Sequence, residues 1–392
     1  MIMLKTVDKI DFSGKKVFVR VDFNVPIKEG LVTDDTRIRE ALKTINYIKE
    51  RGGLVSLASH LGRPGGEKNM QYSLKPVADY INSKDYLKVR FVDDCIGDDV
   101  KNAIKGQESD TVLLLENLRF YFGEERKATD FAHALASNYD VYVNDAFGTC
   151  HRKHTSVYGM PQFMKEKAAG FLIQKEVEYL GKIVASPDRP FAAILGGAKV
   201  SDKIGVIESL LDKADKLLIG GAMAYTFLKY KGYKTGSSRV EEDQMDTVKQ
   251  VLNKSSEEGV PIVLPVDHII SDTFCGKPFA CDSLNIPDGY MGLDIGPATL
   301  RRYKRELQGS KTVLWNGPMG VFESEDYAKG TVGIAKFLAE QDLVSVVGGG
   351  DSVAAVNKAG VADKISHIST GGGASLEYVE YGKLPGIEIL EY

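Results

Sequence analysis

Polar and mostly cationic side chains follow the short apolar runs in the first half of this 392-residue sequence. Arginine binds phosphate or carboxylate through a planar fork of N–H donors. One arginine or histidine after a strand is more often a surface residue, but recurrence at equivalent positions favours a small ligand with several negative charges. The residues in question are Asp22, Asn24, His60, Arg63, Arg119, His151 and Arg152, together with Arg37 just inside a predicted helix.

Glycines follow the apolar runs in the second half. Glycine lets the backbone approach a ligand closely, and the free N–H groups at a helix start bind phosphate. A single Gly-Gly pair usually marks a turn, whereas repeated pairs favour a nucleotide site. We also predict a helix from near Ala198 that shows Lys199 and Lys203 on one face. The glycine clusters are Gly196-Gly197, Gly220-Gly221, Gly317 to Gly320, Gly348 to Gly350 and Gly371 to Gly373.

The sequence contains neither a GxxxxGK[ST] P-loop nor a GxGxxG dinucleotide motif,. A nucleotide site here is therefore of another kind. Asp351 follows one glycine cluster and is a candidate Mg²⁺ ligand,. A helix N-cap is an equally good interpretation of its position.

Continuous apolar runs are typical of strands that are buried on both faces of a parallel sheet. The predicted strands are 17–21, 54–58, 112–115, 141–143, 191–195, 217–219, 262–264, 313–315 and 344–347. Amphipathic segments such as Asp35–Arg51 alternate with them and predict helices,. This alternation predicts an α/β fold with two open, mostly parallel sheets flanked by helices, and prolines near 187–190 mark the division.

The composition excludes several classes of protein. A net charge of −4 gives no support to nucleic-acid or anionic-membrane binding,. The four cysteines are not in CxxC spacing, which disfavours a zinc site,. We find no secretory signal and no apolar stretch long enough to span a bilayer, so we expect a cytoplasmic protein.

Taken together, the motifs resemble those of the phosphoglycerate kinase family along almost the whole chain. Each motif alone is modest evidence, but their joint occurrence in this order is specific. The motifs are 20–26 (RVDFNVP), 59–64 (SHLGRP), 116–120 (ENLRF), His151-Arg152, 195–203 (LGGAKVSDK), 315–323 (WNGPMGVFE), 348–352 (GGGDS) and 370–374 (TGGGA).

The resemblance implies the site residues. The phosphoglycerate would be held by Asp22, Phe23, Asn24, Arg37, His60, Leu61, Gly62, Arg63, Arg119 and Arg152. The nucleotide, ADP or ATP with Mg²⁺, would be held by Gly197, Ala198, Lys203, Gly220, Gly221, Gly292, Asn316, Glu323, Gly349, Gly350, Asp351 and Ser352, with Asp351 near the metal. The transferring phosphoryl group would be surrounded by Arg37, Lys199, Lys203, Gly372 and Gly373.

The resemblance also implies the domain organisation. We expect two Rossmann-like domains, a phosphoglycerate-binding domain at 1–173 and a nucleotide-binding domain at 187–375. A hinge helix at 174–186 would join them, and a tail at about 376–392 would return to the first domain. We expect a monomer that is active after domain closure. Two residues depart from the family pattern: Cys150 stands where alanine is expected, and Ser352 where threonine is common.

The expected reaction is reversible phosphoryl transfer between 1,3-bisphosphoglycerate and ADP, giving 3-phosphoglycerate and ATP. Its nucleophiles are a carboxylate or a phosphate oxygen, both ionised at neutral pH, so no general base is needed. Two alternatives remain open at this point: a nicotinamide-dependent dehydrogenase, and a two-lobed anion-binding protein without catalytic activity.

Overall fold

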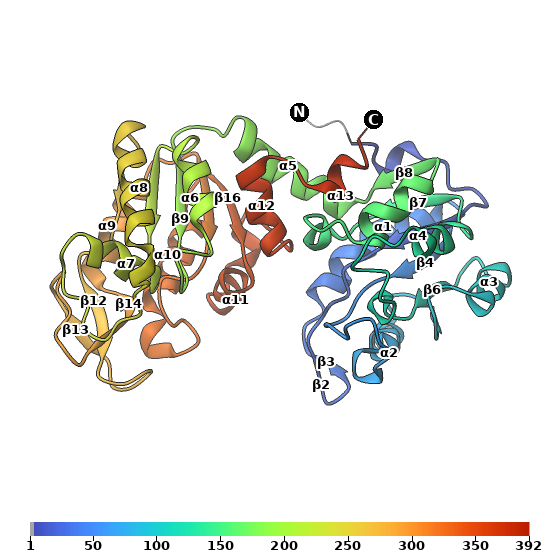
Figure 1. Ribbon diagram of the computed structural model, residues 1–392, viewed down its shortest axis with the longest axis horizontal. Helices are drawn as coiled ribbons and strands as arrows, with labels where there is room; N and C mark the ends of the chain where they lie inside the picture. The colour runs from blue at the N-terminus through green and yellow to red at the C-terminus, as the bar shows by residue number, and fades with distance from the viewer. Residues whose placement is uncertain (1–3, 392) are drawn as a thin grey trace. The chain divides into compact units, whose positions relative to one another are not determined.

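The computed structural model describes residues 4–391 and divides into two compact units (Figure 1). Unit 1 comprises the chain up to Glu178 and the segment from Lys383 onward, and unit 2 is Tyr179–Gly382. The division falls inside helix α5 (Phe171–Ala185), so one continuous helix belongs to both units. This helix begins three residues before the predicted start and ends where 186–190 introduce two prolines.

Unit 1 contains a six-stranded parallel sheet in the order β5-β6-β4-β1-β7-β8. The strands are β1 (Lys16–Arg20), β4 (Leu54–Ala58), β5 (Val89–Val92), β6 (Val112–Leu115), β7 (Val141–Asn144) and β8 (Glu166–Ala169). A short hairpin of β2 (Ile27–Lys28) and β3 (Leu31–Val32) stands apart from it. The helices are α1 (Thr36–Glu50), α2 (Lys75–Ser83), α3 (Asp98–Lys105) and α4 (Thr129–Ala136).

The last segment of unit 1 is the chain from Lys383, which includes α13 (Pro385–Glu388). The Gly386 N–H donates to the Cys150 carbonyl at 2.8 Å. The Leu384, Ile387 and Leu390 side chains are buried. Residues near both ends of the described chain therefore complete unit 1, as the bridge between Leu4 and Glu391 also shows.

Unit 2 contains a second six-stranded parallel sheet, in the order β11-β10-β9-β15-β16-β17. Its strands are β9 (Phe191–Leu195), β10 (Lys216–Ile219), β11 (Ile262–Val263), β15 (Thr312–Asn316), β16 (Val344–Gly348) and β17 (His367–Ile368). Its helices are α6 (Ile204–Leu211), α7 (Met223–Tyr230), α8 (Met245–Glu257), α9 (Pro297–Leu307), α10 (Lys329–Ala339), α11 (Gly350–Lys358) and α12 (Gly373–Tyr381).

An antiparallel sheet that we did not predict is inserted in unit 2. Its order is β13 (Phe279–Cys281), β12 (His268–Ser271) and β14 (Met291–Ile295). The two parallel sheets confirm the predicted α/β class, and the apolar runs are strands whose ends differ from the prediction by one residue at most. No helix in the described part of the chain is long and apolar enough to cross a membrane.

Each parallel sheet reverses its strand order beside its first strand. In unit 1 the strands on either side of β1 are β4 and β7, and in unit 2 those on either side of β9 are β10 and β15. Ligands of open α/β sheets bind beyond the carboxyl ends of the strands at such a reversal. The topology therefore predicts ligand binding at the loops after β1, β4 and β7, and at those after β9 and β15,.

Candidate functional site

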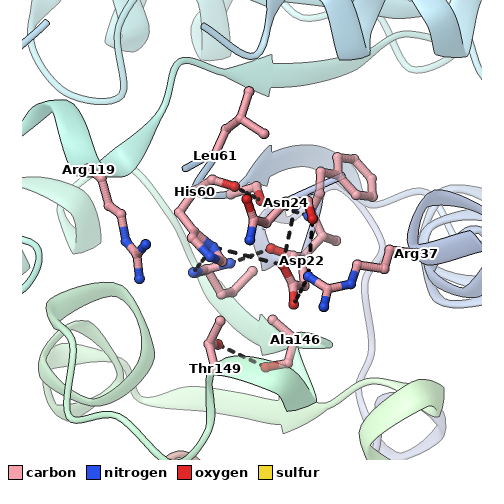
Figure 2. Close-up of polar contacts among 12 residues, drawn as sticks. Asp22, Asn24, Arg37, His60, Leu61, Arg119, Ala146 and Thr149 are labelled. Atoms are coloured by element: carbon pink, nitrogen blue, oxygen red, sulfur yellow. Dashed lines mark hydrogen bonds and ion pairs between the residues drawn. The ribbon is translucent and has the colours of Figure 1, made fainter. Parts of the chain in front are cut away.

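The loops at the carboxyl edge of the unit 1 sheet bring several predicted residues together (Figure 2). Arg37, in the first turn of α1, donates from Nη1 to Asp22 Oδ2 at 2.9 Å and to the Asn24 carbonyl at 3.2 Å. On the other side of Asp22, His60 Nδ1 lies 3.9 Å from Oδ1. These bonds hold the Arg37 side chain in place, and because it is 34% exposed it is still accessible to a ligand.

The loop after β4 is joined to its neighbours through its backbone. Gly62 has a φ of +60° and its N–H donates to Asn24 Oδ1 at 3.0 Å. The Gly62 carbonyl accepts from Arg119 Nη1 at 2.7 Å, and Asn117 bonds both backbone groups of Leu61. A glycine is required here because of the positive φ and because a Cβ would meet the Tyr72 ring at 2.3 Å,.

The other predicted residues of this edge differ in what they offer a ligand. Arg63 and Arg152 are exposed, and their side chains form no ion pair or hydrogen bond within residues 4–391. Arg119 is ion-paired with Glu125 at 3.2 Å. The Phe23 and Leu61 side chains are buried in the core, so only their backbones can meet a ligand.

Burial and positive neighbours keep the histidines of this region neutral. Desolvation is the main cause that lowers the pKa of His151 to about 4 and that of His154 to about 3. The next causes are Arg152 for His151, and Arg119 and Arg20 for His154. The pKa of His60 is also well below its ordinary value. The positive charge of the site therefore comes from arginine.

His154→Gln is expected to flatten the pH dependence of stability. Because folding lowers the pKa of His154 below its ordinary 6.5, this side chain contributes stability above about pH 6.5, and that stability is lost as the pH falls toward 3,. Between pH 7 and 5 the wild type should lose about 2 kcal/mol more than the variant. Urea unfolding at each pH measures the difference. The exposed His133→Gln is the control, and equal slopes for wild type and H154Q would contradict the expectation.

Unit 2 has a pocket of about 940 Å³ beyond the ends of β9, β10 and β15, with the first residues of β14 in its wall. Six of the predicted nucleotide residues line it: Gly197, Ala198, Gly221, Gly292, Glu323 and Asp351. Lys203, Gly220, Asn316, Gly349, Gly350 and Ser352 are not part of its wall. At Gly220 a Cβ would meet Met319 Sδ at 2.3 Å, so this glycine allows protein packing and does not itself open to the pocket.

Lys203 and Asn316 meet at the strand reversal of unit 2. Lys203 Nζ donates to the Gly196 carbonyl at 2.7 Å, to the Asn316 carbonyl at 3.1 Å and to Asn316 Oδ1 at 2.7 Å. These three acceptors match the three N–H donors of an ammonium group. Burial lowers the pKa of Lys203 to about 8, although Asp351 and Asp202 act in the opposite direction.

The predicted helix from near Ala198 is wrong. Helix α6 begins at Ile204, with Lys203 as its N-cap residue, and Lys199 lies in the preceding loop. Glu241 holds this loop in a non-helical conformation by accepting the N–H groups of Val200 at 2.6 Å and Ser201 at 3.2 Å. Lys199 and Lys203 therefore do not share a helical face, and Lys199 is exposed.

Two helix starts in unit 2 contain the remaining predicted residues. Asp351 is exposed in the first turn of α11, whose N-cap is Gly349, so the N-cap interpretation of Asp351 is wrong. Ser352 Oγ is buried and accepts the Gly317 N–H at 2.5 Å. Helix α12 has Gly372 as its N-cap, with a φ of +54°, and a Cβ at Gly372 or Gly373 would meet nothing within 4 Å. Both glycines thus leave open space at a helix start.

The two departures from the family pattern have simple structural accounts. Cys150 is fully buried, and desolvation raises the pKa of its thiol far above the ordinary value. The backbone of Gly386 also packs against it. It is therefore an inert thiol. Ser352 uses the hydroxyl that threonine would also supply.

Part of the pocket wall was not predicted from the sequence. Tyr225, Ser237, Arg239 and Met291 line the pocket, as do Phe274 and Cys275 in the loop between β12 and β13. Tyr225 lies in α7, Ser237 and Arg239 lie in the loop after it, and the others lie in the inserted antiparallel sheet or its loop. No strand-end glycine motif marks these segments. For this wall, only the family resemblance gave a prediction, at Gly292.

The chain matches one protein family over nearly its full length. The family model described as "Phosphoglycerate kinase" matches residues 7–383. The phosphoglycerate kinase of Borrelia hermsii is 51% identical over 390 residues, and that of Anaeromyxobacter sp. is 53% identical over 395 residues, each covering 99% of both chains. The crystal structure of phosphoglycerate kinase from Pyrococcus horikoshii superposes with a TM-score of 0.86 at 33% identity, covering 99% of this chain and 98% of that one. The structure from Coxiella burnetii gives a TM-score of 0.88 at 37% identity with the same coverage.

Proposed function

The chain belongs to the phosphoglycerate kinase family, and from this premise we propose that unit 1 binds the phosphoglycerate and unit 2 binds the nucleotide. The protein is a phosphotransferase that acts on a carboxyl group. The observation that supports the division of labour is the contrast between the two sheet edges. Arginines lie together at the carboxyl edge of the unit 1 sheet, whereas unit 2 has a pocket lined in part by glycines.

We propose that the acid binds across the loops after β1, β4, β6 and β7. Arg63 and Arg152 are exposed cations without an ion-pair partner within residues 4–391, so an anionic ligand gains their charge without breaking a contact,. Arg37 and Arg119 are already positioned by Asp22 and Gly62. The proposed ligand set also includes Asn24, His60 and the backbone at Phe23, Leu61 and Gly62.

The residues of unit 2 fit a nucleotide that carries Mg²⁺. The exposed Asp351 carboxylate stands in the pocket wall at a helix start, and no group of three or more His, Cys, Asp or Glu side chains in the described chain could hold a metal alone. That donor set suits Mg²⁺, which is usually held by one or two carboxylates, substrate phosphates and water. When bound, Mg²⁺ neutralises phosphate charge. The exposed Glu323 carboxylate also lines the pocket, and the family resemblance implies that it contacts the ribose hydroxyls.

The protein assists the reaction by neutralising negative charge and by positioning the two substrates. The acceptor is already ionised, so no side chain has to remove a proton. Arg37 of unit 1 and Lys199 and Lys203 of unit 2 would offset the repulsion between two anions. The open backbone at Gly372 and Gly373 would donate N–H groups at the start of α12. Transfer requires the two substrates to meet, so we propose that the units close during the reaction.

A coupled assay tests the proposed function. With 3-phosphoglycerate, ATP and Mg²⁺, the protein is expected to form 1,3-bisphosphoglycerate, which glyceraldehyde-3-phosphate dehydrogenase detects by oxidising NADH. Omitting any one of the three should abolish the signal. Turnover that does not depend on 3-phosphoglycerate would contradict the proposed substrate.

Gly292→Ala is expected to weaken ATP binding by about tenfold or more. A Cβ at Gly292 would lie 2.0 Å from Tyr225 Oη, and the tyrosine is buried in the pocket wall and has little room to move. Titration calorimetry measures the Kd. Gly181→Ala in α5 is the matched control, because its Cβ would meet only Tyr378 Oη at an ordinary 3.5 Å. Unchanged ATP affinity in G292A would place the nucleotide elsewhere.

Three expectations of the sequence analysis stay predictions: a monomer, a cytoplasmic location and a dependence on Mg²⁺. The full-length family match gives no support to a nicotinamide-dependent dehydrogenase or to a non-catalytic anion-binding protein. We propose no second function.

A further inference from the structure

A buried arginine contacts a ring nitrogen of the proposed ligand histidine. Arg20, the last residue of β1, is 1% exposed, and its Nη2 lies 3.2 Å from His60 Nδ1. Arginine has only N–H donors, so Nδ1 must be the acceptor and carries no hydrogen. In a neutral imidazole the single hydrogen is then on Nε2.

The surroundings of His60 disfavour a second proton. Desolvation is the largest cause of its lowered pKa, and the positive charges of Arg20, Arg119 and Arg37, with His154, act in the same direction. The facing acid is Asp22, whose Oδ1 lies 3.9 Å from Nδ1, and Asp22 also bonds Arg37. Because Nδ1 accepts from Arg20, the contact with Asp22 is not an ion pair.

Arg20 is itself fixed by a buried chain of hydrogen bonds. Its Nε donates to Ser156 Oγ at 2.9 Å, and its Nη1 donates to the Val21 carbonyl. Ser156 Oγ in turn donates to Glu124 Oε1 at 2.6 Å, and the Ser156 N–H donates to Glu124 Oε2 at 2.9 Å. Glu124 is fully buried. The guanidinium is therefore held on several sides and cannot turn away from the histidine.

We propose that Arg20 is a positioning residue that holds His60 as the neutral tautomer with its hydrogen on Nε2, ready to donate to an anionic oxygen of the substrate. Nε2 has no hydrogen-bond partner within residues 4–391, so the donor is free. The assignment to this substrate rests on the proposed function. Without Arg20, the ring can place its hydrogen on Nδ1 toward Asp22, or take up a second proton.

Nitrogen NMR of the full chain labelled with ¹⁵N-histidine tests the proposal directly. Six histidines give twelve ring-nitrogen signals, two for each ring, and the spectrum of His60→Gln identifies the pair from His60,. In the wild type we expect a protonated Nε2 and a bare Nδ1, with no titration between about pH 6 and 8. A hydrogen on Nδ1, or titration near the ordinary pKa, would overturn the proposal.

Arg20→Met and Arg20→Lys distinguish a role of Arg20 in positioning His60 from a purely structural role. R20M should populate the other tautomer or titrate, whereas R20K keeps a cationic donor and should keep the wild-type tautomer. In R20M the KM for 3-phosphoglycerate, divided by that of the wild type, should rise by about tenfold from pH 6 to 8, with the KM for ATP unchanged. A flat ratio with an unchanged tautomer in R20M would overturn the proposal.

Arg90→Met is the matched control, because Arg90 on β5 also loses a hydrogen bond, from Nη2 to the Ala103 carbonyl at 2.7 Å. It should change neither the His60 signal nor the KM ratio. If R20M does not fold, the wild-type and R20K spectra still decide. The spectra do not depend on activity, so the expected tautomer in a protein that does not use 3-phosphoglycerate would contradict the proposed function and not the role of Arg20.

Discussion

Arg37→Ala is expected to lower kcat by about 10³-fold or more, with little change in ATP affinity. Arg37 is the one proposed phosphoryl-group contact that comes from unit 1. Its Nη1 is already bound to Asp22 and to the Asn24 carbonyl, so the guanidinium is oriented before substrate binds. A preorganised cation stabilises developing charge without reorganising during the reaction.

Steady-state kinetics in both substrates, with titration calorimetry for ATP, measure these effects. Arg39→Ala is the matched control: it lies two residues further along α1, is 56% exposed and pairs with Asp35. The control should stay within about twofold of the wild type. A loss of only about tenfold in R37A would reduce Arg37 to a substrate-binding role.

Lys203→Met is expected to have an effect of similar size, about 10³-fold in kcat. The ammonium group lies where the ends of β9 and β15 meet, bonded to Gly196 and Asn316. Its three N–H groups already have protein acceptors, so contact with a phosphate requires at least one of these bonds to open. The substitution also leaves buried carbonyl groups unpaired, which should cost about 1–3 kcal/mol of stability.

The pH dependence separates the two effects of K203M. Because burial lowers the pKa of Lys203 to about 8, the free enzyme should lose kcat/KM as the pH rises through 8, and this alkaline limb should be absent from K203M,. Lys213→Met is the control, since Lys213 is also half-buried in unit 2 and bonds the Ser209 carbonyl at 3.1 Å. A persistent alkaline limb in K203M would assign that limb to another group.

The parallel sheets could be predicted because their strands are apolar on both faces. β6 and β9 are buried at every residue, and short apolar runs bounded by polar or glycine residues are typical of such strands,. The sequence gives no such signal for β5 and β8. β5 lies at a sheet edge, where a single arginine, Arg90, interrupts its apolar residues. β8 (Glu166–Ala169) consists of helix formers that become a strand by pairing with β7,.

The candidate site was predictable where it lies at the end of a strand. Asp22, His60 and Gly197 lie two residues after a strand and Arg119 lies four residues after one, so the parallel topology brings each to a ligand-binding edge. Tyr225 and Phe274 could not be found in this way, because one lies inside α7 and the other in a loop of the antiparallel insertion. Residue spacing does not show that α7 and the loop between β12 and β13 reach the pocket.

The return of the chain to unit 1 fixes an order for its synthesis. Unit 2 is one continuous segment, so every residue it needs has been made once Gly382 has emerged from the ribosome. Unit 1 was begun first but needs Leu384, Ile387 and Leu390, which are buried in it, and the Gly386 N–H that meets Cys150. Its two pieces must find each other across an already synthesised unit 2, so the first unit begun is the last to be completed, and a nascent chain halted before Leu384 lacks the residues that close it.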